Sequence, residues 1–236
     1  MEYFFSDEPG LLAAAKVNEA LARQKHQPTL LLLSGGSAFS FLNLLDVPAL
    51  PKTLTIGMLD ERHEAKGVGN NFAEFTRLNV YAQLQGNGVS FLDSRVKAGE
   101  SFKEFGERFL QGLLTWRNAH NEGVVIATIG LGPDGHTAGL FPGLAALWDI
   151  ERAWAVAYEV PTQVSIYTKR VSVTPTFLKT EVTLAIAYVV GAGKESALFR
   201  VMKRDGTSSA LPAILWHDLK NLAVVTDIPP LPAVAD

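Results

Sequence analysis

The chain has 236 residues, of which 47% are hydrophobic and 19% are charged, and its formal net charge is −3. This composition predicts a soluble protein with a sizeable core, organised as one domain over residues 1–236. The slightly acidic balance predicts no nucleic-acid partner, because nucleic-acid-binding domains carry a marked excess of positive charge. The absence of cysteine excludes disulfides, thiolate nucleophiles and cysteine–zinc sites, and it fits a reducing cytoplasm.

No uninterrupted apolar stretch reaches the ~18 residues that a membrane span requires. The first residues include Glu2, Asp7 and Glu8 and lack the basic-then-apolar start of a signal peptide. We therefore expect a cytoplasmic protein with no membrane contact, present as a monomer or a small homo-oligomer.

Short apolar stretches alternate with amphipathic stretches along the chain, which predicts an α/β fold. Strands are predicted near residues 3–5, 29–33, 53–59, 89–92, 123–128, 153–160, 170–173, 182–190 and 222–226. Helices are predicted after Ser6, Ser37 and Asn71, over residues 100–118, and after Lys194. The segment from Ile228 onward is rich in proline and has no predicted element.

The segment after the strand at 123–128 reads I-G-L-G-P-D-G-H-T-A-G-L-F-P-G over residues 129–143. Loops at the carboxyl ends of strands bind ligands in α/β proteins. His136 suits proton transfer, because the unperturbed pKa of histidine lies near neutral pH. Asp134, two residues earlier, is placed to orient the imidazole ring and to stabilise its charged form.

Three interpretations of this loop compete: a glycine-rich turn with an incidental histidine, a dinucleotide-binding fingerprint, and a catalytic loop. Gly130, Gly132 and Gly135 spell the fingerprint G-x-G-x-x-G. That motif requires a long helix that begins at the loop and an acidic residue after the next strand. Pro142 and Gly143 end any helix within about two turns, which disfavours it. The catalytic interpretation depends on other parts of the chain.

Two further turns combine glycine with polar residues. Ser34-Gly35-Gly36-Ser37 joins a strand to a predicted helix, an arrangement that presents free backbone N–H groups to an anion. Gly191-Ala192-Gly193-Lys194 adds a lysine at a helix start, but the spacing is not that of a Walker A loop. A plain tight turn and an exposed lysine are the alternatives for these two segments.

Asp60-Glu61-Arg62 stands at the carboxyl end of the strand at 53–59. The three charged residues are either a solvated turn or part of the crevice that Ser34–Ser37 line. Since the carboxyl ends of parallel strands meet at one edge of a sheet, we expect them to face that crevice.

Taken in order, S-G-G-S, D-E-R, G-x-G-x-D-G-H-T-A-x-L-F-P-G and G-A-G-K resemble the 6-phosphogluconolactonase family, which shares its fold with glucosamine-6-phosphate deaminase/isomerase. The resemblance covers about residues 30–226, and its central motif is the most specific part. It implies a three-layer sandwich with a mainly parallel, Rossmann-like sheet flanked by helices. The implied reaction is hydrolysis of 6-phospho-D-glucono-1,5-lactone to 6-phospho-D-gluconate in the pentose phosphate pathway, with no metal or organic cofactor.

The resemblance also implies roles for individual residues. His136 is the general base that activates water, Asp134 orients it, and Arg62 stabilises the oxyanion charge that develops on the lactone. The residues implied to bind the substrate and its phosphate are Ser34, Gly35, Gly36, Ser37, Asp60, Arg170 and Lys194.

Two other functions remain open from the sequence. The deaminase loop carries a glutamate seven residues after the aspartate, where this chain has Phe141. A phenylalanine cannot transfer a proton, so the substitution favours lactone hydrolysis over deamination. A phosphosugar-binding module without catalytic activity is the second alternative.

Overall fold

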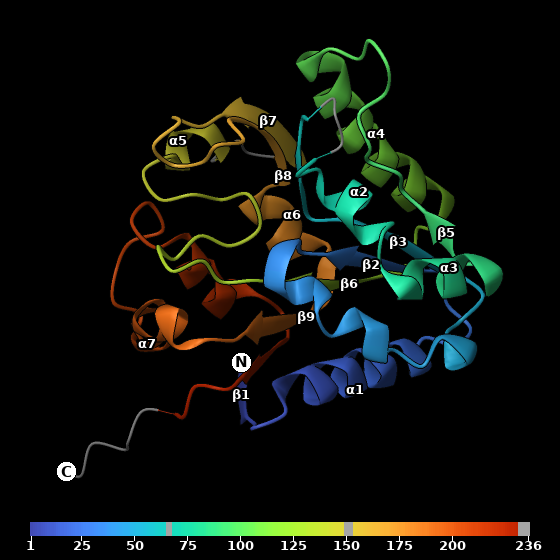
Figure 1. Ribbon diagram of the computed structural model, residues 1–236, viewed down its shortest axis with the longest axis horizontal. Helices are drawn as coiled ribbons and strands as arrows, with labels where there is room; N and C mark the ends of the chain where they lie inside the picture. Colours follow the sequence, from blue (N-terminus) through green and yellow to red (C-terminus); the bar gives the residue numbers. More distant parts are fainter. Residues whose placement is uncertain (65–67, 149–152, 231–236) are drawn as a thin grey trace.

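The computed structural model describes residues 1–64, 68–148 and 153–230, and its centre is a seven-stranded sheet (Figure 1). Every neighbouring pair in this sheet is parallel. The strand order is β1 (Glu2–Phe5), β10 (Leu222–Thr226), β9 (Val182–Val189), β6 (Val124–Ile129), β2 (Thr29–Leu33), β3 (Leu54–Met58) and β5 (Ser90–Phe91). The predicted mainly parallel sheet is therefore confirmed.

Helices cover both faces of the sheet. In Figure 1, α1 (Pro9–Ala22) lies below β2, β6 and β9, whereas α4 (Phe102–Ala119) and α6 (Pro175–Thr180) lie above them. This confirms the predicted three-layer α/β sandwich. The other helices are α2 (Asn71–Phe75), α3 (Asn79–Gly86), α5 (Ala145–Trp148) and α7 (Glu195–Lys203). Within the described part of the chain, every helix is too short or too polar to cross a lipid bilayer.

The central strands are apolar because both of their faces are covered. All five residues of β2, which reads T-L-L-L-L, are buried, and so are all residues of β6 after Val124. A strand between two helical layers has no solvated face, so it loses the alternation of polar and apolar residues.

The position of β2 beside β6 determines where a ligand can bind. From β2 the chain continues to β3 on one side, whereas from β6 it continues to β9 on the other side. The loops that leave two such strands diverge and open a crevice at the carboxyl edge of the sheet. Ser34 follows β2 and Gly130 follows β6, so both glycine-rich loops begin at this crevice.

A second, antiparallel sheet lies beyond β3. It consists of β4 (Asp60–Arg62), β8 (Lys169–Val173) and β7 (Ala155–Glu159). The chain passes from β3 through Leu59 directly into β4, so residues 60–62 form a strand and not the exit loop that we expected from the sequence. Alternate residues of a strand point to opposite faces. Asp60 and Arg62 therefore share one face, and Glu61 points to the other.

The prediction of a helix after Ser37 is wrong. The chain forms three short 3₁₀ turns instead, η1 (Gly36–Phe39), η2 (Leu42–Leu44) and η3 (Val47–Ala49). Gly36 has φ +67°, outside the helical range. Pro48 and Pro51 then lack the backbone N–H that a continuing helix would require. Phe39, Phe41, Leu42 and Leu45 are buried nevertheless, so the spacing of these apolar residues reflects their packing and does not indicate a helix.

Glu61 is fully buried on the reverse face of β4 and joins it to α2. Its carboxyl oxygens accept hydrogen bonds from the backbone N–H groups of Arg62 (2.9 Å), Asn71 (2.5 Å) and Phe72 (2.9 Å), and from the hydroxyl of Ser94 (2.9 Å). Burial raises the pKa of Glu61 to about 8, although these hydrogen bonds oppose the shift. The same contacts orient Arg62 and Asn71, two residues on the cavity side.

This pKa predicts a pH dependence of stability that Glu61→Gln removes. The raised pKa predicts that the folded protein keeps a proton on Glu61 up to about pH 8, whereas the ordinary pKa is 4.5. The contribution of this proton to the free energy of unfolding is full below pH 4.5 and is lost as the pH rises through about 8. We expect the free energy of unfolding of the wild type, measured in urea and relative to Glu61→Gln, to fall across this range.

The exposed Glu107 on α4 offers a matched control, and Glu107→Gln should show no such trend. A difference between wild type and Glu61→Gln that stays constant with pH would mean that the four donors keep the carboxylate ionised.

Candidate active site

A cavity of about 220 Å³ opens where the loops after β2, β6 and β9 meet the small sheet. Most of the sequence-predicted site residues line it, namely Ser34, Gly35, Gly36, Ser37, Asp60, Arg62, His136, Arg170 and Lys194. Asp134 is outside the lining and reaches the cavity through His136. The structure therefore brings together residues that are up to 160 positions apart in the sequence.

The loop after β6 is folded back on itself. The backbone N–H of Gly132 donates to the carbonyl of His136 (2.8 Å), and that of Gly135 donates to the carbonyl of Gly132 (2.9 Å). Gly135 has φ +87°, a conformation that favours glycine. A side chain at Gly132 would overlap the imidazole of His136. Both glycines are thus needed to present the histidine at the cavity.

Asp134 holds the imidazole of His136. Its Oδ1 lies 2.6 Å from Nδ1 of the ring and accepts a further hydrogen bond from the backbone N–H of His136 at 3.1 Å. Partial burial raises the pKa of Asp134, but the hydrogen bonds and charge of His136 outweigh it, so the net pKa is lowered. The carboxylate therefore accepts the proton on Nδ1, which leaves Nε2 free to take a proton.

Phe141 packs against two residues of the cavity. Its ring centroid lies 4.7 Å from that of His136 and 5.1 Å from the guanidinium carbon of Arg170. Its ring also belongs to a small apolar cluster with Tyr158 and Val160. The ring thus restricts the movement of the imidazole, a role that only the structure reveals.

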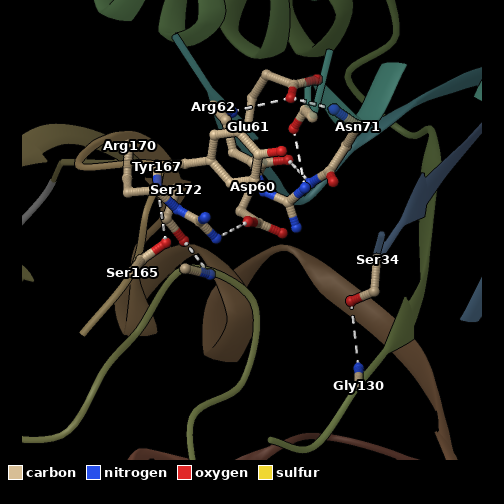
Figure 2. A network of polar contacts seen from close by, with 12 residues as sticks. Ser34, Asp60, Glu61, Arg62, Asn71, Gly130, Ser165, Tyr167, Arg170 and Ser172 are labelled. Carbon is tan, nitrogen blue, oxygen red and sulfur yellow. Dashed lines mark hydrogen bonds and ion pairs between the residues drawn. The ribbon is translucent and has the colours of Figure 1, made fainter. Parts of the chain in front are cut away.

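The two glycine-rich loops are tied together across the crevice. The hydroxyl of Ser34 is buried and accepts a hydrogen bond from the backbone N–H of Gly130 at 3.2 Å (Figure 2). Gly36 faces open space, and among the described residues no acceptor occupies the backbone N–H of Gly36 or Ser37. Ser34 therefore has a structural contact, whereas the next residues present free donors.

The small sheet places two arginines at the cavity. Arg62 and Arg170 are directly opposite each other on β4 and β8 (Figure 2). Arg170 is 4% exposed and donates to the equally buried carboxylate of Asp60 at 2.9 Å. Nη1 of Arg62 donates to the carbonyl of Gly69 at 2.8 Å. Asp60 thus pairs with one of the two guanidinium groups, and Glu74 approaches the other only to 3.8 Å, so the balance favours an anionic ligand.

Lys194 reaches the cavity from the turn η4 (Ala192–Lys194), just before α7. Its ammonium group donates to the hydroxyl of Ser37 at 3.1 Å, which connects the two predicted glycine turns. Burial lowers the pKa of Lys194, and the nearby charge of Asp227 opposes this shift. The structure therefore places the ammonium group of Lys194 beside the first glycine-rich loop.

Asn71 also lines the cavity, although no sequence pattern indicates it. The helix predicted after Asn71 begins at Asn71 itself and is capped by Asn70, whose side chain accepts from the backbone N–H of Ala73 at 2.9 Å. Asn71 instead donates to the backbone carbonyl of Asp60 at 2.9 Å and packs where any side chain on Gly35 would lie. Two adjacent asparagines gave no basis for choosing between them.

A larger cavity of about 540 Å³ lies between residues 91–97 and α4. Apolar side chains form much of its lining, and its arginines are already paired, Arg95 with Asp93 and Arg108 with Glu100. It contains no histidine, so we assign no chemistry to it. The described residues include no group of three or more His, Asp or Glu side chains arranged to hold a metal.

Comparison with solved structures shows the same fold in bacterial and protozoan proteins. A 6-phosphogluconolactonase from Thermotoga maritima is 18% identical, with a TM-score of 0.74 over 95% of this chain and 98% of that one. The Trypanosoma brucei 6-phosphogluconolactonase is 19% identical, with a TM-score of 0.73 over 95% of both chains. A 6-phosphogluconolactonase from Shewanella baltica is 20% identical, with a TM-score of 0.71 over 95% and 96% of the two chains.

Comparison with curated protein sequences gave no significant match. A family model described as glucosamine-6-phosphate isomerases/6-phosphogluconolactonase matches residues 10–224, which includes all of the cavity residues. The chain therefore belongs to the glucosamine-6-phosphate isomerase/6-phosphogluconolactonase family.

Proposed function

We propose that this protein hydrolyses 6-phospho-D-glucono-1,5-lactone to 6-phospho-D-gluconate, the reaction of the pentose phosphate pathway. The observation that carries the proposal is the Asp134–His136 pair, which faces a cavity that also holds Arg62, Arg170 and Lys194. A base and a cluster of cations in one cavity match a neutral carbonyl and an anionic phosphate on one substrate. The structural relatives named above support this choice.

The chemistry requires one base and one hydrogen-bond donor that stabilises the negatively charged carbonyl oxygen. In this proposal Nε2 of His136 takes a proton from water, and the water oxygen attacks the lactone carbonyl. Arg62 stabilises the negative charge that develops on the carbonyl oxygen. The bond from that carbon to the ring oxygen then breaks, and His136 returns its proton to the ring oxygen. Asp134 stabilises the charged imidazole between the two transfers.

The remaining cavity residues suit the phosphate. The free N–H groups of Gly36 and Ser37, the ammonium of Lys194 and the guanidinium of Arg170 provide donors to its oxygens. Asp60 carries a negative charge, so we assign it to orienting Arg170 and not to binding phosphate directly. Together these groups provide the local positive charge that the net charge of −3 lacks.

Phe141 disfavours the amino-sugar reaction of the same family. It contacts the His136 ring at the position where a deaminase would need a carboxylate for ring opening. A cytoplasmic location is part of the same proposal and is supported by the absence of cysteine.

Replacing His136 by alanine should remove the base and leave the cations. We expect lactone hydrolysis above the spontaneous rate to fall by about two to four orders of magnitude. Binding of 6-phosphogluconate, measured by calorimetry, should persist. His26→Ala, an exposed position after α1, is the matched control. Retained turnover in His136→Ala, or ammonia release from glucosamine-6-phosphate by the wild type, would contradict the proposal.

Replacing Lys194 by methionine should weaken phosphate binding and leave the general base His136 unchanged. The loss of one charge-assisted hydrogen bond predicts an increase in KM of about tenfold to a hundredfold, with a smaller change in kcat. Steady-state kinetics with Lys203→Met, an exposed position at the end of α7, provides the comparison. An unchanged KM would remove Lys194 from the phosphate site.

A further inference from the structure

Arg62 lines the cavity, but no carboxylate among the described residues forms a close ion pair with its guanidinium. It lies directly opposite Arg170 in the β4–β8 ladder, and like charges in that relation repel each other. The nearby carboxylate of Asp60 accepts a hydrogen bond from Arg170, at 2.9 Å. Glu74 approaches Nη1 of Arg62 only to 3.8 Å. Its guanidinium therefore needs other contacts to hold one orientation.

Two contacts do hold it, and they come from different loops. The carbonyl of Gly69 accepts from Nη1, and the ring of Tyr167 lies over the guanidinium with its centroid 5.0 Å from Cζ. The face of an aromatic ring attracts a cation and favours a parallel guanidinium plane. The carbonyl fixes one edge of the group, and the ring limits its rotation.

Tyr167 is itself fixed in place. A Cβ on Gly69 would overlap the hydroxyl end of the Tyr167 ring, so the bare backbone of Gly69 packs against it. The backbone N–H of Tyr167 donates to the hydroxyl of Ser165 at 3.1 Å (Figure 2). The N–H of Val160 donates to the carbonyl of Thr168 at 2.8 Å and closes the base of the loop. The ring is thus held between its own loop and the segment that binds Arg62.

The loop itself shows that Tyr167 is not simply an exposed aromatic residue. Its neighbour Ile166 is 83% exposed, whereas Tyr167 is half-buried against Arg62 and Gly69. Tyr167 does not line the cavity, so its route to the substrate passes through Arg62.

We propose that Tyr167 is a positioning residue whose ring fixes the guanidinium of Arg62 toward the cavity; this rests on the proposed lactone hydrolysis. The contact with Arg62 is made by the face of the ring, which phenylalanine keeps and leucine lacks. Tyr167→Phe therefore keeps the function, and Tyr167→Leu loses it. Since Tyr167 acts through Arg62, its effect disappears once the guanidinium is gone.

The test is a double-mutant cycle on kcat/KM for lactone hydrolysis above the spontaneous rate. We expect Tyr167→Leu to lower kcat/KM by about threefold to thirtyfold, which is the range of a partly desolvated cation–π contact. Tyr167→Phe should stay within about twofold of wild type, and so should Ile166→Ala, the control on the same loop. In an Arg62→Met background, Tyr167→Leu should have no further effect.

Three results would overturn the proposal: no loss in Tyr167→Leu, an equal loss in Tyr167→Phe, or an unchanged loss in the Arg62→Met background. Melting temperatures of all variants separate a folding defect from misplacement of Arg62, because a folding defect lowers the melting temperature and misplacement of one guanidinium does not. If the wild type does not accelerate lactone opening, the proposed function fails. The same cycle is then measured on binding of 6-phosphogluconate by calorimetry, where Tyr167→Leu must still weaken binding through Arg62.

Discussion

The parallel alignment of β2, β3, β6 and β9 is the constraint on which the site depends. β2 and β3 are buried throughout, and β6 and β9 are buried except near their first residues, so the chain places charged groups only where these strands end. Because all four run in one direction, their carboxyl ends meet at one edge. The divergence of the chain between β2 and β6 then opens a crevice at that edge, and the bond between Ser34 and Gly130 limits how far it opens.

The small antiparallel sheet adds charge to this crevice in a buried setting. Removing a charged group from water is costly unless it is paired and hydrogen-bonded. Asp60 satisfies Arg170. On the opposite face of the same strand, four hydrogen-bond donors surround the buried carboxyl group of Glu61, whose pKa is raised by burial. One short strand therefore has two tasks: its even-numbered residues supply the cavity, and Glu61 attaches it to α2. The guanidinium of Arg62 depends on this attachment through the backbone of its own residue.

His136 illustrates how a mobile side chain becomes a defined base. Asp134 holds one edge of its ring, Phe141 covers it from another direction, and Gly132 leaves the space that the imidazole occupies. The same principle recurs at Arg62, where a carbonyl and an aromatic ring limit a guanidinium. In both cases a polar contact sets direction and an aromatic contact restricts rotation, which is how a preorganised site limits reorganisation during the reaction.

The sequence alone determined the α/β class and most strands, because buried strands and glycine-rich turns leave local patterns in the chain. The resemblance of its motifs to a known family indicated most of the residues that line the cavity. Local patterns gave the wrong prediction at Gly36–Ala49, where glycine and prolines produce 3₁₀ turns although the apolar residues have helical spacing. They also gave the wrong prediction at Asp60–Arg62, where three charged residues form a strand and not a loop. Only the tertiary structure decided that Glu61 is buried, that Asp134 contacts His136, and that Phe141 and Tyr167 support the charged groups. The contacts of Glu61 and Tyr167 join residues from different strands and loops, and such pairings arise from packing in three dimensions, which no short stretch of sequence records. Asp134, His136 and Phe141 belong to one loop, and their contacts depend on the folded conformation of that loop.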